Sequence, residues 1–110
     1  MADHPFHGKW RSQVLRKNHT VHEDGEFHLT ITPAGIFTKG DHNGTNLKCT
    51  NISNNSITLE EEAGDKGTFT GEVFQGTGKK ILVGEAKFPD PLDRKNALGQ
   101  NDGVWVGTQP

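Results

Sequence analysis

The stretch that determines the fold class is residues 67–88, which read GTFTGEVFQGTGKKILVGEAKF. Two runs of β-forming residues flank Gly76-Thr77-Gly78. Glycine supplies the positive φ that a tight connection between two antiparallel strands requires. The stretch therefore predicts a β-hairpin. Similar β-type segments, bounded by turn residues, lie on either side of it.

Short β-type segments bounded by turn residues occupy most of the remaining sequence. The first segment, Gly8–Lys17, places Trp10, Ser12, Val14 and Arg16 on one face. Asp24-Gly25 predicts a hairpin turn, and Gly40–Gly44 predicts a loop. The other predicted strands are Glu26–Thr32, Ile36–Lys39, Thr45–Ile52, Ser56–Glu62 and Val104–Thr108.

These segments predict an all-β domain of about eight strands over residues 8–110, preceded by a loose polar leader over residues 1–7. Tight turns place each strand beside the one before it, which favours a small antiparallel up-and-down barrel; a β-sandwich is the alternative. Barrel closure removes both sheet edges, so the first and last strands should pair and bury Trp10. Asp90, Pro91 and Gly99 are typical helix-boundary residues and predict one short helix near 90–99.

Composition limits the classes of function. The chain has 110 residues, is 30% hydrophobic and carries a net charge of −2, so it shows no basic surface for nucleic acid and no membrane-spanning stretch. Cys49 is the single cysteine, which excludes an internal disulfide and favours a reducing, cytoplasmic location. If the chain is instead a trimmed secreted protein, four Asn-x-Ser/Thr sites become glycosylation acceptors: Asn18, Asn43, Asn51 and Asn54.

Three pieces of the sequence resemble the avidin and lipocalin group of small calycin-type barrels. Gly8-Lys9-Trp10 is similar to the Gly-x-Trp that opens their first strand. Residues 69–82 resemble a late avidin hairpin, and Val104–Thr108 resembles a closing strand. Ser12 stands where streptavidin-like sequences have a first-strand Asn. The resemblance implies the barrel; biotin binding is not carried over, because the chain lacks Tyr and has only two Trp residues.

The candidate ligand-binding residues are Trp10, Ser12, Arg16, Glu85 and Trp105. For both Trp residues, a role in core packing is an alternative to ligand binding, since a Trp often fills the end of a small barrel. Glu85 depends on the strand register. If Ile81 and Val83 point inward, so does Glu85, and it marks a pocket; if Leu82, Ala86 and Phe88 point inward, Glu85 lies on the surface. The second register is favoured because it buries Phe88.

Metal, cofactor and nucleophile chemistry have little support in the sequence. His19 and His22 lie three positions apart, which on a strand directs them to opposite faces, so polar surface histidines are the simpler interpretation than a metal site. Cys49 reads as a small buried hydrophobe rather than a reactive thiol. We therefore expect no cofactor.

The leading hypothesis is a non-catalytic barrel that holds a small, partly apolar ligand at one end. The alternative is an interaction module, either carbohydrate-binding or a protein or protease inhibitor, that acts through its loops. A third hypothesis is a barrel isomerase or cyclase with His28 or Glu85 as acid or base. A homo-oligomer remains possible, because pairing between chains can also cover a sheet edge.

Overall fold

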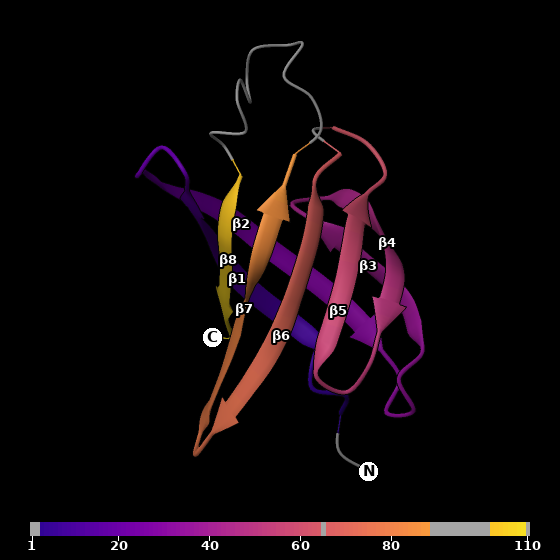
Figure 1. The fold of residues 1–110 in the computed structure, drawn as a ribbon. Coiled ribbons are helices and arrows are strands. Elements are labelled where there is room, and N and C mark those ends of the chain that lie inside the picture. The colour runs from indigo at the N-terminus through magenta and orange to yellow at the C-terminus, as the bar shows by residue number, and fades with distance from the viewer. Residues whose placement is uncertain (1–2, 65, 89–101, 110) are drawn as a thin grey trace.

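A computed structural model describes residues 3–64, 66–88 and 102–109 of the chain. The described residues form eight antiparallel strands that close into a barrel (Figure 1). The strands are β1 (Gly8–Arg16), β2 (Val21–Ile31), β3 (Phe37–His42), β4 (Thr45–Ile52), β5 (Ser56–Glu61), β6 (Thr68–Gly76), β7 (Lys79–Lys87) and β8 (Gly103–Thr108).

The strand order confirms the up-and-down barrel and excludes the sandwich. Each strand pairs with the next one in sequence, and β8 returns to pair with β1. In that closing ladder Val14 lies opposite Trp105 and Arg16 lies opposite Gly103. The short helix predicted near 90–99 lies outside the described residues.

Two hairpin turns show how local sequence sets the strand boundaries. In the β6–β7 hairpin Gly76 pairs with Lys79, and Gly78 has a positive φ of 68°. Between β3 and β4, Asn43 and Gly44 both have positive φ, 51° and 89°. Two consecutive positive φ values define a type I′ turn, the usual two-residue hairpin connection. The predicted loop over Gly40–Gly44 is therefore wrong: β3 continues to His42, and only two residues turn the chain.

The structure also corrects the predicted turn at Asp24-Gly25. Strand β2 begins at Val21 and passes through both residues. Opposite them, Ser12 pairs with Gly25 and Gln13 pairs with Glu23, so Asp24 is an extra residue in the ladder. Gly25 has a φ of 78°. This is a β-bulge with glycine in the left-handed conformation, which bends the strand instead of reversing it.

The barrel interior is filled by alternate residues of all eight strands. Trp10, Phe27, Phe69 and Trp105 are its largest strand-borne side chains, and each is fully buried. The remaining buried apolar residues are Phe6, Val14, Leu29, Ile31, Leu47, Ile57, Leu59, Val73, Leu82 and Ala86.

Residues 3–7 lie at the barrel end where β1 begins, here called the leader end. Phe6 is fully buried there, and the indole N–H of Trp10 donates to the Phe6 carbonyl at 2.9 Å. His4 is also buried, and Lys80 Nζ donates to the Pro5 carbonyl at 3.0 Å. The prediction of a loose leader is therefore wrong for residues 3–7, because Phe6 packs into the core at this end of the barrel. The opposite end, where β1, β3, β5 and β7 finish, is called the polar end.

Candidate functional site

A buried acid–imidazole–acid cluster lies inside the polar end. Asp24 of β2, His42 of β3 and Glu61 of β5 are its members, with side-chain exposures of 5%, 7% and 8%. His42 Nδ1 lies 3.0 Å from Glu61 Oε2, and His42 Nε2 lies 3.4 Å from Asp24 Oδ2. His42 Nε2 also contacts the backbone carbonyl of Asp24. The cluster thus joins three strands across the interior.

The bulge in β2 and the turn after β3 place these groups. The Asn43 amide lies against the bulge: its Nδ2 donates to the Asp24 carbonyl at 3.1 Å, and its Oδ1 accepts from the Glu26 N–H at 2.9 Å. A Cβ at position 25 would collide with this amide, so the arrangement requires Gly25. On β5, Glu61 Oε1 accepts from the Gly67 N–H at 2.9 Å, which fixes its carboxylate.

The contacts of His42 favour the imidazolium form. Both ring nitrogens face oxygen acceptors, so protonation of both lets each nitrogen donate. Burial by itself lowers the pKa of His42, but the hydrogen bond to Glu61 and the charge of Asp24 outweigh burial and raise that pKa above its usual value. These contacts therefore favour a protonated His42 held between two carboxyl groups.

The electrostatics of Asp24 differ from those of His42 because burial raises the pKa of a carboxyl group, whereas it lowers that of an imidazole. Burial raises the pKa of Asp24. The nearby charges of His42 and His22 oppose that rise, and the like charge of Glu61 adds to it. His22 Nε2 lies 3.5 Å from Asp24 Oδ1 and is partly exposed, so the cluster reaches solvent on this side.

Aromatic rings form the wall beside the cluster. The His42 ring stacks on Phe27 with centroids 4.0 Å apart and an interplanar angle of 9°. The edge of Phe69 meets His42 at 5.4 Å. Trp105 packs against both phenyl rings, at 5.0 Å from Phe27 and 5.3 Å from Phe69. The cluster therefore lies against buried aromatic rings.

Two buried nitrogens in the described part of the chain have no hydrogen-bond partner: Arg16 Nε and Trp105 Nε1. Their strands are adjacent, and the pairs Val14–Trp105 and Arg16–Gly103 make the two residues diagonal neighbours on the inner face. A buried N–H without an acceptor costs roughly 1–3 kcal/mol. The polar end thus has unpaired donors on the β1–β8 side and carboxylates on the β2–β5 side.

The structure places four of the five residues that the sequence predicted for a ligand site on the inner face of the barrel, but it divides them between the two ends. Trp10, Ser12 and Trp105 are interior, and Ser12 Oγ lies 3.5 Å from Asp24 Oδ2. Arg16 shares their face at the end of β1. Glu85 does not join them: its side chain is 60% exposed and pairs with Lys87 at 3.2 Å. The register that buries Leu82 and Ala86 is the observed one.

Sequence reasoning missed the cluster itself. The sequence predicts a turn at Asp24 and a loop at His42, and it places Glu61 near the end of the strand Ser56–Glu62 without marking it as a site residue. Two signals would have found His42 and Glu61. Asn43-Gly44 is a strong two-residue hairpin signal, which extends β3 to His42. Glu61 follows Ile57 and Leu59 at the period of two that defines the inner face of a strand.

The other candidate residues do not join the cluster of Asp24, His42 and Glu61. His28 is on the outer face, near Glu26 and Asp41. Burial raises the pKa of the Cys49 thiol, with a hydrogen bond to the Asn51 carbonyl opposing it, so the thiolate is disfavoured. Among residues 3–64, 66–88 and 102–109 no group of three or more His, Cys, Asp or Glu is arranged to hold a metal ion. The same residues include no helix long and apolar enough to cross a membrane.

Comparison of the chain with protein-family models, with curated proteins and with solved structures gives no match. The closed eight-stranded antiparallel barrel is consistent with a calycin-type fold.

Proposed function

We propose that this protein is a non-catalytic barrel that binds a small, partly apolar ligand at the polar end. The observation that carries the proposal is the pair of buried N–H groups without acceptors, Arg16 Nε and Trp105 Nε1. Native structures rarely leave such donors unpaired, and a bound acceptor is one of the standard explanations. Both residues belong to the candidate set derived from the sequence.

The contrast between the barrel ends supports the choice of end. At the leader end the equivalent donor, Trp10 Nε1, is already satisfied by the Phe6 carbonyl. Phe6 and His4 fill that end, and both are buried. A ligand inside the barrel at that end would have to displace the protein's own packing. The Gly8-Lys9-Trp10 opening, which resembles that of avidins and lipocalins, is compatible with a barrel that holds its ligand at one end.

The chemistry of the polar end narrows the ligand class. An acceptor such as a carbonyl or carboxylate oxygen would meet the donors of Arg16 and Trp105. A planar or alkyl body would pack on the aromatic wall of Phe27 and Phe69. A donor group on the ligand would face Asp24. His42 is not available as a ligand contact or as a base, because both of its nitrogens are bonded within the protein.

Quenching of Trp fluorescence tests the proposal. In a Trp10→Phe background, Trp105 is the only tryptophan, so titration with a panel of small aromatic carboxylates and neutral carbonyl compounds reports on the polar end alone. We expect saturable quenching by at least one class. Arg16→Gln should weaken that binding at least about tenfold, as loss of a charge-assisted hydrogen bond does.

Arg11→Gln is the matched control, because it removes the same group from the same strand. The Arg11 side chain is 71% exposed and contacts Glu26 on the outer face. We expect it to bind like the parent. The proposal is overturned if no compound gives saturation, or if Arg11→Gln and Arg16→Gln weaken binding equally.

A further inference from the structure

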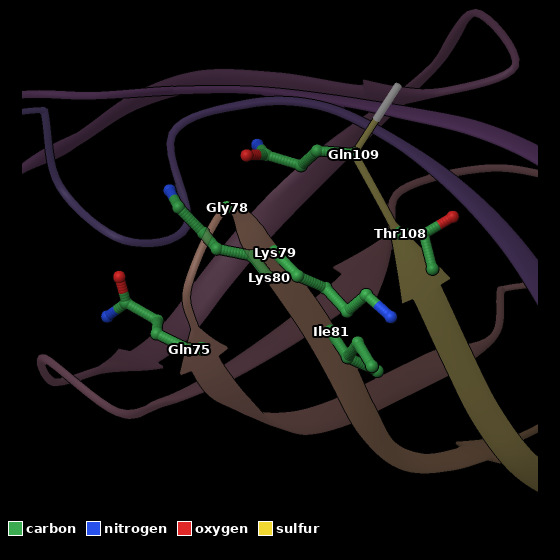
Figure 2. Close-up of a pocket in the computed structure, with 8 residues that line it drawn as sticks. Gln75, Gly78, Lys79, Lys80, Ile81, Thr108 and Gln109 are labelled. Atoms are coloured by element: carbon green, nitrogen blue, oxygen red, sulfur yellow. The ribbon is translucent and has the colours of Figure 1, made fainter.

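An open cleft lies at the leader end, away from the site described above. It is formed where the β6–β7 hairpin meets the end of β8, and its volume is about 600 Å³. This lies within the usual range for small-molecule sites. Figure 2 shows the side chains around it: Gln75, Lys79, Lys80, Ile81, Thr108 and Gln109.

The lining of the cleft is positively charged although the whole chain is not. It includes two lysines and no carboxylate, whereas the net charge of the protein is −2. Within the described residues neither Lys79 nor Lys80 is in an ion pair, while Lys87, near the other end of β7, pairs with Glu85. The hairpin tip thus presents uncompensated positive charge beside a concave surface.

Alternation along β7 separates the two lysines. Lys79 and Ile81 project to one face of the strand, and Lys80 projects to the other. The Lys80 ammonium is held in place, because Nζ donates to the Pro5 carbonyl at 3.0 Å. An ammonium has three protons, so two remain for a ligand. The side chain whose geometry is fixed in advance is therefore Lys80.

The two glutamines supply neutral donors around the same cleft. Gln109 Nε2 donates to the His7 carbonyl at 3.0 Å, which fixes the amide of Gln109 near the start of β1. Gln75 precedes the turn on the neighbouring strand β6 and pairs with Lys80 in the ladder. An ammonium flanked by amide groups is a donor set that suits an oxyanion.

The positive field of Lys80 also reaches the buried leader. Burial lowers the pKa of His4, and the charge of Lys80 lowers it further. An anion bound to Lys80 would cancel part of that charge, so the pKa of His4 would rise when the cleft is occupied. His4 is therefore a reporter for the cleft that does not itself line it.

We propose that this cleft is a second binding site, which takes a small molecule through its phosphate or carboxylate group. Lys80 provides the main contact, with the amides of Gln75 and Gln109 beside it. The proposal is independent of the ligand at the polar end, because the two sites share no residue.

Titrations followed by ¹H–¹⁵N NMR test the site. One titration uses inorganic phosphate and the other uses acetate, so the two anion classes are distinguished. We expect saturable shifts confined to the hairpin tip, to Gln109 and to the leader, and an upward shift in the pKa of His4 at saturation. Lys80→Gln should weaken binding at least about tenfold. Lys87→Gln, on the same strand but in an existing ion pair, should bind like the parent.

Gln75→Leu keeps the proposal testable if Lys80→Gln disturbs the leader. It leaves the Lys80–Pro5 contact in place and should weaken binding severalfold. Shifts spread over many surface lysines without saturation would overturn the proposal. So would equal binding by the parent and a folded Lys80→Gln variant, or a pKa of His4 that does not move.

Discussion

The two ends of the barrel interior are built in opposite ways. At the leader end Phe6 packs beneath Trp10, and the polar atom of the Trp10 indole is bonded to the backbone. At the polar end the equally buried Trp105 has an unpaired indole N–H and shares the interior with Asp24 and His42. One end is organised for packing, whereas the other holds buried charge and unpaired donors, which packing alone would avoid.

This difference separates stability from function within one small core. Buried charges are retained in proteins at an energetic cost, and an apolar replacement of similar shape is often at least as stable. The buried charges of the polar end therefore indicate a role other than stability. We therefore expect substitutions of the buried apolar residues at the leader end to act on stability alone, and those at the polar end to act on stability, on pH dependence and on ligand binding.

The largest effect should come from Trp10→Ala at the leader end. Trp10 is fully buried, and its removal leaves a cavity under the core and an unpaired Phe6 carbonyl. We expect a loss of about 3–5 kcal/mol in the free energy of unfolding. Urea denaturation followed by circular dichroism measures it. A loss below about 0.5 kcal/mol, typical of surface changes, would contradict the role given to this end.

His42→Ala should be nearly as damaging, by a different mechanism. It leaves Asp24 and Glu61 buried without a cation, in a region where β3 and β4 pair over only two residue pairs. We expect a loss of about 3 kcal/mol, the lower part of the range for broken buried ion pairs. Adding Asp24→Asn and Glu61→Gln should restore part of the stability, because the uncompensated charges are then gone. If these two changes destabilise the His42→Ala variant further, charge is not the cause.

The stability of the polar end should depend on pH, because the buried cluster there contains titratable groups. The pKa of His42 is raised on folding, so its stabilising effect is complete below its unfolded value of 6.5 and is lost as pH rises through the higher folded value. Asp24 acts in the same direction: its pKa is also raised, so ionisation above its ordinary 3.8 costs stability. The cluster should therefore lower the urea midpoint as pH rises above 6.5. His42→Gln should remove most of this fall, and an unchanged slope in that variant would contradict the assignment.

The fold was predictable because its signals are local and repeated. Alternation in β2 and β5, the glycine turn before Lys79 and the pairing of the first and last strands follow from residue periodicity and from the need to cover sheet edges. The burial of Phe6 was not predictable in this way, since it depends on a single apolar residue in a polar segment.

The cluster at the polar end was harder to predict because its residues look like turn and surface residues. Asp24-Gly25 is a common hairpin signal, and only the pairing partner on β1 shows that it is a bulge here. Glu61 lies within the acidic run Glu60-Glu61-Glu62, and the other two residues of that run are outside the cluster. Partners from three strands make these groups a site, and sequence spacing within one strand carries no information about the other two.

The smallest and most specific test makes the same substitution at both ends. Trp10→Phe and Trp105→Phe remove similar volume from fully buried positions, so their packing costs should be similar. They differ in the indole N–H. At position 10 the change breaks a satisfied hydrogen bond and leaves the Phe6 carbonyl unpaired, whereas at position 105 it removes a donor that has no partner.

We therefore expect Trp105→Phe to cost about 1 kcal/mol less than Trp10→Phe, the typical net worth of one hydrogen bond. Paired urea melts followed by circular dichroism measure the difference. An equal or larger cost at position 105 would mean that its N–H is already satisfied in the unliganded protein, and the main support for a ligand at the polar end would be lost.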